Sequence, residues 1–223
     1  MLAASLINPM IPVLKPSDSV STALDWMDEF GVKQLIVADN GLYQGIVSED
    51  ILFDVTDSAE LLARIIIQHK DIFASEDQHP YELLRIVNQF GLQIIPVLHD
   101  DRSFAGSILV NELVEHFVND LGVQEKGAVI VLKIAERSYS LSEISRLIES
   151  NGTKILSSYY SSGESYDPTN EAKLTLKLNR THITPIIATL ERFGYEVEEA
   201  HANDPIESVD QERLDMLLRY LAT

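Results

Sequence analysis

The positions of apolar residues along the first half of the chain predict alternating helices and strands. A helix is expected just before Gly31, because apolar residues recur there at helical spacing. These residues are Val20, Ala23, Leu24 and Met27. A strand over 34–38, an Asn40-Gly41 turn and a return strand over 43–47 follow. Ser48 then stands where the N-cap of a second short helix is expected.

The same order recurs about sixty residues later. The first copy reads Gly31-Val-Lys-Gln-Leu-Ile-Val37 and Gly45-Ile-Val-Ser-Glu-Asp-Ile-Leu52. The second reads Gly91-Leu-Gln-Ile-Ile-Pro-Val97 and Gly106-Ser-Ile-Leu-Val-Asn-Glu-Leu113. Self-similarity at a fixed offset indicates paired structural units that need each other. We therefore expect a first repeat over 1–58, a linking helix over 59–70 and a second repeat that ends near 121, with a cleft between the copies.

The apolar pattern changes after residues 122–127, which form the expected boundary. Strands are predicted over 128–134, 154–161, 173–178 and 195–200. Helices with apolar stripes precede Gly152 and Gly194. The resulting order over 127–200 is strand-helix-strand-strand-helix-strand, the split βαβ arrangement of ferredoxin-like domains. The whole chain is thus expected to be α/β (α+β).

The last segment, 203–223, is predicted to be a helix. It begins with a cap and an N1 proline, Asn203-Asp-Pro205. One helical face collects Leu214, Leu217, Leu218 and Leu221. The sequence leaves open whether this face packs on its own domain or on a second subunit.

Composition and charge exclude several classes of function. There is no cysteine, and no two of the six histidines are spaced i, i+4, so no metal site is expected. A formal net charge of −18 supplies no basic face for nucleic acid or anionic membranes. The start of the chain lacks the basic residues of a signal peptide, and no apolar run approaches the roughly 20 residues that span a bilayer. A cytoplasmic protein is expected.

Catalytic motifs are missing from the sequence. Neither phosphate-binding loop, Gly-x-x-x-x-Gly-Lys or Gly-x-Gly-x-x-Gly, is present, and there is no Gly-x-Ser-x-Gly elbow. Together with the duplicated cleft, this favours a regulatory or binding protein over an enzyme, with no required cofactor.

The paired unit, over roughly 5–121, resembles a tandem CBS-domain (Bateman) module in its element order and in Gly-Ile-Val-Ser followed by an acidic residue. The resemblance implies an adenosine-containing ligand in the cleft, such as AMP, ADP, ATP, S-adenosylmethionine or NAD, and a homodimer. In that family a Ser or Thr three residues after the glycine and an Asp six residues after it contact the ligand. The implied cleft residues are Gln34, Ile36, Ser48, Asp50, Ile94, Pro96, Asn111 and Glu112.

Both copies depart from that family pattern. Asp50 comes one residue early, which turns it by about 100° on a helix. In the second copy Leu109 replaces the hydroxyl and Glu112 replaces the aspartate. Alternative roles therefore stay open: Ser48 as a plain helix cap, the two acidic residues as favourable charges in a first helical turn, and Ile36 and Pro96 as packing residues.

The segment 127–200 resembles an ACT domain through Glu136-Arg-Ser-Tyr-Ser-Leu-Ser-Glu-Ile-Ser-Arg-Leu-Ile, followed by Gly152 and Ile155. ACT domains often bind amino acids through the loop after the first strand, which implies Arg137, Ser138, Tyr139 and Ser140 here. Tyr139 stands where the family commonly has glycine, so a dimerising role is the alternative. A CBS pair followed by an ACT domain is similar to the B-type acetoin-utilisation proteins.

Two functions remain in competition. The first is a regulatory protein that senses an adenosine-containing ligand, with the ACT-like domain serving for dimerisation or a second ligand. The second is a ligand-free homodimeric interaction scaffold whose pockets have degenerated. The regulated target is not specified by the sequence.

Overall fold

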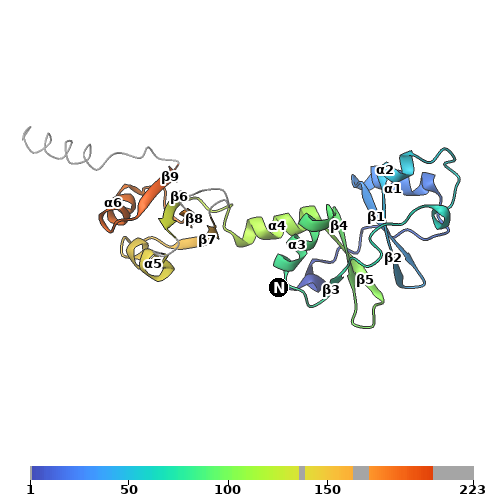
Figure 1. Ribbon diagram of the computed structural model, residues 1–223, viewed down its shortest axis with the longest axis horizontal. Coiled ribbons are helices and arrows are strands. Elements are labelled where there is room, and N and C mark those ends of the chain that lie inside the picture. The colour runs from blue at the N-terminus through green and yellow to red at the C-terminus, as the bar shows by residue number, and fades with distance from the viewer. Residues whose placement is uncertain (1, 136–138, 163–170, 203–223) are drawn as a thin grey trace, which may run out of the picture. The chain divides into compact units, whose positions relative to one another are not determined.

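The computed structural model describes residues 2–135, 139–162 and 171–202 (Figure 1). The chain divides into two compact units, residues 1–116 and 117–223. The expected mixed α/β class is confirmed by the alternation of helices and strands. The finer boundaries at residues 58, 121, 127 and 200 stay predictions.

Unit 1 contains the two predicted copies as hairpins that lie side by side, each with its helices (Figure 1). The first copy consists of α1 (Val20–Phe30), β1 (Gln34–Asp39), β2 (Leu42–Ser48) and α2 (Glu49–Phe53). The second consists of β3 (Ala74–Ser75), α3 (Pro80–Phe90), β4 (Ile94–Leu98), β5 (Phe104–Leu109) and α4 (Val110–Asp120). The predicted helix-strand-strand-helix order is therefore confirmed in both.

Local chemistry explains why the first helix of each copy has the same limits. The Ser19 side chain accepts a hydrogen bond from the Thr22 amide at the start of α1. His79 caps α3, and Pro80 takes its first position, where no amide is needed. Gly31 and Gly91, sixty residues apart, end the two helices with φ of 62° and 63°, a left-handed conformation that costs glycine little.

The strands also match between the copies. β1 pairs antiparallel with β2, and β4 pairs antiparallel with β5. Each pair has a register shift at the same place, after Val37 and after Val97. A short parallel contact flanks each hairpin: β3 runs beside β4, and Leu14 makes the equivalent bridge to Val37. Each copy is therefore a βαββα unit, although the first β element is a single bridge in copy one.

The predicted linking helix over residues 59–70 is wrong. The segment has only a short 3₁₀ turn, η2 (Leu62–Arg64), followed by extended chain. Gln68 exchanges both backbone hydrogen bonds with Ile46 of β2, at 2.8 Å each. Such pairing requires an extended backbone, so the segment serves as a strand-like cover on the first copy.

The start of the chain does the same for the second copy. A 3₁₀ turn, η1 (Ala3–Leu6), precedes Asn8, whose amide donates to the Ser107 carbonyl of β5 at 2.9 Å. Ala3 donates to the Gln78 carbonyl, just as Leu62 donates to Asp18 in the first copy. Each copy is thus covered by the leading segment of the other.

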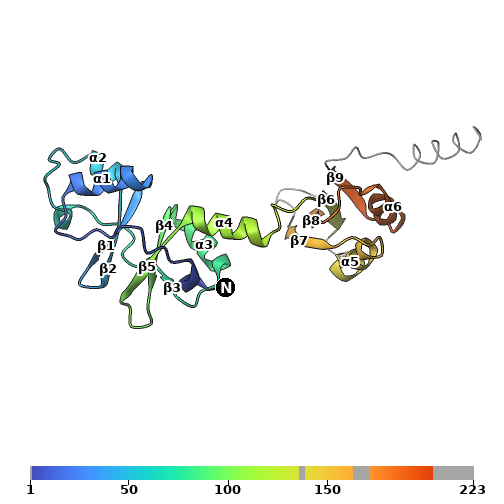
Figure 2. The same ribbon diagram turned by 180° about the vertical axis from the view of Figure 1, so that it is seen from behind.

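Unit 2 has the predicted strand-helix-strand-strand-helix-strand order. Its elements are β6 (Val129–Ala135), α5 (Leu141–Glu149), β7 (Ile155–Ser161), β8 (Glu171–Leu178), α6 (Thr184–Arg192) and β9 (Glu196–His201). The strands form one antiparallel sheet in the order β7-β8-β6-β9. Both helices pack on one face, where Ile130, Leu132, Ile144 and Leu190 belong to a single buried core (Figure 2).

Residues 203–223 lie outside the described part of the chain, so the predicted C-terminal helix stays a prediction. Among the described helices, none combines the length and apolar character required to cross a bilayer.

Candidate functional site

The seam between the two copies is held by reciprocal hydrogen bonds. The Gln93 amide donates to the Gln34 side-chain oxygen at 2.8 Å, and the Lys33 amide donates to the Gln93 side-chain oxygen at 3.2 Å. The Gln34 amide nitrogen also donates to the Gly91 carbonyl at 3.5 Å. Behind these contacts one apolar core runs through both copies and includes Leu35 and Ile94. The copies therefore form one folded body with a polar rim.

A cavity of about 320 Å³ opens at this seam. The end of α1, the loop before β1, the start of β4 and the junction of β5 with α4 contribute to its walls. The lining residues are Phe30, Gly31, Val32, Lys33, Gln93, Leu109, Val110 and Asn111. Its volume is at the lower end of the roughly 300–1,000 Å³ typical of small-molecule sites. Both copies contribute residues, so a ligand here would contact both.

The N-terminal end of α4 and Lys33 bring positive charge to this cavity, while Glu112 in the first turn of α4 brings a carboxylate close to it. Val110 and Asn111 are the first residues of α4, an eleven-residue helix, whose N-terminal end carries a partial positive charge. Lys33 adds an ammonium group, and its side chain is 70% exposed. Its pairing with Glu49 at 3.8 Å is a surface contact of the kind that contributes little. A bound phosphate can therefore recruit this lysine at small cost.

The two sides of the seam are not equivalent. Gln34 of β1 bridges to the Gly91 turn, whereas the residue sixty positions later, Ile94, is fully buried in the core. The apolar Ile94 side chain has no group with which to bridge to Gly31, and the cavity lies at that turn. The Gln34 bridge thus occupies one side of the seam, while the other side is open.

The structure separates the sequence-predicted cleft residues into distinct roles. Ile36, Ile94 and Pro96 are buried within strands, which matches the packing alternative. Ser48 is the N-cap residue of α2, but its side chain makes no capping hydrogen bond, and Asp50 is exposed in the first turn of that helix. Asn111 lines the cavity.

Glu112 has a structural partner from the beginning of the chain. Its Oε1 accepts a hydrogen bond from Asn8 Nδ2, in the segment that crosses β5. Its Oε2 is buried with no hydrogen-bond partner among the described residues. The carboxylate is therefore held by the covering segment, and it is not among the residues that line the cavity.

Of the eight residues that line the cavity, Asn111 alone was among the sequence-predicted cleft residues, and the polar ones that were missed are Lys33 and Gln93. Lys33 and Gln93 occupy equivalent positions in the repeat, two residues after the glycines that end α1 and α3. The sequence does contain a signal for these two residues. In both copies a polar residue stands between the glycine that ends the helix and the buried strand that follows.

The loop that the sequence implied for amino-acid binding, residues 137–140, is only partly within the described residues. Arg137 and Ser138 lie outside them. Ser140 caps α5 by accepting from the Glu143 amide at 3.4 Å. Tyr139 packs edge-on against Tyr160, with 5.1 Å between ring centroids. The two residues that the structure describes thus have structural contacts.

A second cavity, of about 530 Å³, lies in unit 2. Among its lining residues are Lys133, Glu143, Tyr195 and Glu196. The Tyr195 hydroxyl donates to Glu143 at 2.9 Å. Burial, and then this hydrogen bond, raise the pKa of Tyr195 to about 12. The phenol is therefore neutral at physiological pH and acts as a hydrogen-bond donor.

Comparison with known proteins finds structural likeness without a family match. No protein-family model matches the chain. A CBS domain pair/ACT domain protein from Thermotoga maritima aligns with 19% identity and a TM-score of 0.49, over 53% of this chain and 98% of its own. The CBS-pair protein CBSX2 from Arabidopsis thaliana aligns with 18% identity and a TM-score of 0.47, over 53% and 94%. The CBS domains of a transcriptional regulator from Streptococcus pneumoniae align with 13% identity and a TM-score of 0.47, over 52% and 98%.

Proposed function

We propose that this chain is a non-catalytic regulatory protein that binds an adenosine-containing small molecule in the cavity between its two repeats. The supporting observation is the cavity of about 320 Å³ whose walls come from both copies. A ligand that contacts both copies favours whichever packing of the copies suits it, and so shifts a conformational population. Such a shift reports that the ligand is bound, and it requires no catalysed reaction.

The cavity residues match the parts of a nucleotide. Lys33 and the first turn of α4 provide positive charge for a phosphate. The Asn111 amide offers both a donor and acceptors to ribose hydroxyls or to a base edge. Phe30 supplies apolar surface at the cavity wall. We further propose one ligand for each pair of repeats, since the Gln34 bridge takes up the opposite side of the seam.

Calorimetric titration of the full chain with AMP, ADP, ATP, S-adenosylmethionine and NAD tests this function. We expect saturable binding of at least one of them, with a stoichiometry of about one per chain. Asn111→Ala should weaken that binding about fivefold or more, the loss of roughly one hydrogen bond. Asn119→Ala, an exposed asparagine near the other end of α4, is the matched control. Absence of heat from all five compounds overturns the proposal.

The scaffold alternative has its own supporting observations. Asn8 engages Glu112, Tyr139 packs on Tyr160, and Gln34 bridges the seam, so several candidate ligand contacts are satisfied by the protein itself. In this alternative, the chain is a cytoplasmic homodimer whose surfaces recruit other proteins.

A thermal-shift panel with nucleotides and amino acids, combined with light scattering, separates the two functions. A true ligand raises the melting temperature by mass action, by an amount that grows with its concentration. A dimer whose melting temperature is moved by none of the compounds supports the scaffold. A shift by amino acids alone would assign sensing to unit 2 instead of the paired repeats.

A further inference from the structure

Among the described elements of unit 2, both helices lie on one face of the sheet, and the opposite face carries none. Side chains alternate along its strands, so those that do not enter the α5/α6 core point to the opposite face. Val129 and Val131 of β6 and Thr175 and Lys177 of β8 alternate with buried residues in this way, and all four are half-buried. Tyr159 of β7 pairs with Thr175 and is 59% exposed. We call this surface the open face.

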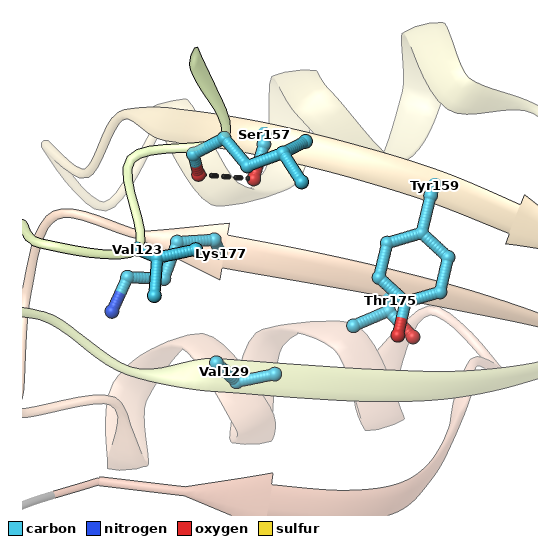
Figure 3. A pocket seen from close by; sticks show the side chains of 7 residues that line it. Val123, Val129, Ser157, Tyr159, Thr175 and Lys177 are labelled. Atoms are coloured by element: carbon cyan, nitrogen blue, oxygen red, sulfur yellow. Dashed lines mark hydrogen bonds between the residues drawn. The ribbon is translucent and has the colours of Figure 1, made fainter. Parts of the chain in front are cut away.

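One end of the open face contains an apolar cavity of about 220 Å³ (Figure 3). Its lining residues are Leu121, Val123, Val129, Ser157, Tyr159, Thr175 and Lys177. The chain that leads from α4 into β6 forms one wall, and it is fixed there because the Ser157 hydroxyl donates to the Leu121 carbonyl at 2.8 Å. Val123 belongs to this wall and is itself 57% exposed, so the wall covers the apolar end of the face only in part.

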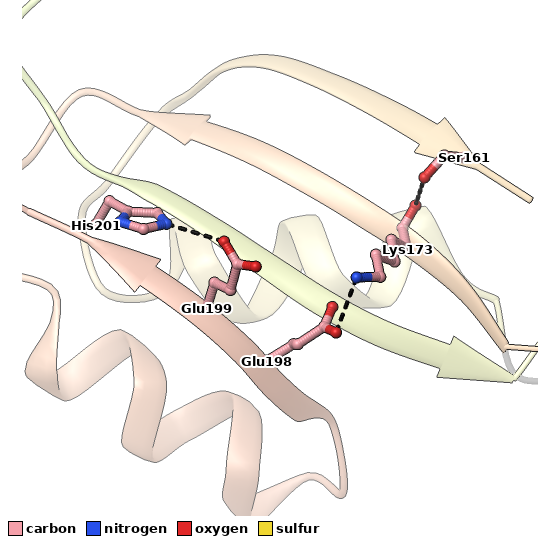
Figure 4. A network of polar contacts seen from close by, with 5 residues as sticks. All are labelled: Ser161, Lys173, Glu198, Glu199 and His201. Carbon is pink, nitrogen blue, oxygen red and sulfur yellow. Dashed lines mark hydrogen bonds and ion pairs between the residues drawn. The ribbon is translucent and has the colours of Figure 1, made fainter. Parts of the chain in front are cut away.

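Charged groups elsewhere on the open face pair with one another. Lys173 lies 2.8 Å from Glu198, and His201 lies 3.0 Å from Glu199 (Figure 4). The Ser161 hydroxyl donates to the Lys173 carbonyl. The Lys173–Glu198 pair reaches from β8 across β6 to β9, and the His201–Glu199 pair lies within β9, so these charges already have partners. The apolar end around Val129 and Tyr159 is therefore the part of the sheet that gains most from being covered.

We propose that the tail of the same chain, residues 203–223, covers this apolar end with the leucine stripe of an amphipathic helix. The place where the sheet ends supports this. His201, the last residue of β9, pairs directly with Val129, which lines the cavity. The tail thus leaves the sheet beside the surface that it is to cover.

The length and pattern of the tail fit the open face. From Leu214 to Leu221 a helix rises about 10 Å, at about 1.5 Å per residue. Neighbouring strands lie about 4.8 Å apart. The leucine stripe thus matches the width from β6 across β8 to β7, the three strands that line the cavity. The preceding residues, 203–213, are long enough to turn the chain back onto the face.

Charge also favours this occupant. Lys177 is the charged residue among those that line the cavity. The tail contains five acidic and two basic residues, so it approaches the lysine with net negative charge. A leucine stripe on a helix of that charge complements an apolar cavity that one lysine lines.

A disulfide-trapping experiment tests this inference in the full chain, which has no cysteine of its own. The test variant combines Thr175→Cys with Leu217→Cys. The matched control combines Thr175→Cys with Asp215→Cys, because residue 215 lies on the opposite side of the helix from residue 217. A disulfide requires β-carbons within about 3.5–4.5 Å of each other. We expect the test variant to oxidise within one chain about tenfold faster than the control.

Two results would overturn the inference. One is equal oxidation of test and control variants. The other is a test variant that crosslinks only between two chains, which would assign the surface to a second copy. A second measurement guards against disturbance by the cysteines. Leu217→Asp in the otherwise unchanged chain should speed hydrogen exchange at the amides of β6 and β8 severalfold, while Asp215→Asn should not. Unchanged exchange in Leu217→Asp also overturns the proposal.

Discussion

Gln34 of the first repeat accepts a hydrogen bond from the backbone amide of Gln93 in the second, at 2.8 Å. The contact joins the start of β1 to the residue just before β4. At these two places the strands of the two repeats enter the common core. It makes Gln34 part of the architecture of the seam and removes it from the set of free ligand-binding groups.

Replacing this glutamine should weaken the seam. Gln34→Leu leaves the Gln93 amide without its acceptor, and we expect the free energy of unfolding to fall by about 1 kcal/mol. Urea denaturation followed by circular dichroism measures the change. Gln44→Leu is the control, since the hydrogen bond of the Gln44 side chain within the described residues stays inside its own strand, to the Leu42 carbonyl at 3.5 Å. Equal midpoints for the two variants would show that the bridge contributes nothing.

Gly45 should tolerate substitution much less well than Gly31. Gly45 has φ of 136°, and an added methyl group would overlap the Gln68 carbonyl and the Ile67 side chain. Backbone strain of about 1–3 kcal/mol and overpacking of about 1–3 kcal/mol should both appear in Gly45→Ala. Gly31→Ala meets no atom within 4 Å and should cost only the left-handed penalty of about 1–2 kcal/mol. Comparable melting temperatures would contradict the close crossing of the linker over β2.

The Asn8–Glu112 contact should show energetic coupling. Asn8→Ala leaves both Glu112 oxygens without a hydrogen-bond partner among the described residues, and we expect a cost of about 1–3 kcal/mol. In Glu112→Ala the same Asn8 replacement should cost much less. A double-mutant cycle from denaturant unfolding measures the difference. Additive single effects would mean that the two side chains do not interact.

The stability of unit 2 at alkaline pH should depend on Tyr195. Its folded pKa of about 12 exceeds the ordinary value of 10.0, so folding favours the protonated phenol. The stabilisation that this provides is complete below pH 10 and is lost as the pH rises towards 12. Near-ultraviolet titration of the wild type against Tyr195→Phe isolates this tyrosine. Glu143→Gln should lower the pKa but leave it above 10.0, because burial is the larger cause.

The repeat and the order of its elements were predictable because they depend on local signals. Gly31 and Gly91 end helices through their own backbone freedom, and Asn40-Gly41 makes its turn wherever it stands. The split βαβ order of unit 2 followed equally from alternating runs and helical stripes. None of these inferences required knowledge of distant contacts.

The prediction of a helix in the linking segment, residues 59–70, was wrong for the opposite reason. Three consecutive isoleucines, Ile65 to Ile67, fit a helical stripe and an extended strand equally well. Burial in the structure alternates instead: Ile66 is 74% exposed, while the residues on either side are half-buried. The β2 strand of the first repeat decides the conformation, through Ile46 and its pairing with Gln68. Contacts across more than twenty residues override local preference here.

The candidate site was predictable only where a family motif marked it. Asn111 lies next to the motif position and does line the cavity, whereas Lys33 and Gln93 have no such motif. They become neighbours only when the two copies pack together. The Gln34 bridge was hidden for the same reason, since its partner Gln93 lies 59 residues away in the chain.

The exchange of leading segments makes the halves of unit 1 mutually dependent. Residues 2–8 complete the second repeat, and residues 62–68 complete the first. A protease cut at the exposed turn near residues 57–59 would therefore leave two fragments, neither of which carries its own cover. Such fragments should be stable only when recombined. The two repeats of unit 1 thus behave as a single obligate assembly, in which each is completed by the leading segment of the other.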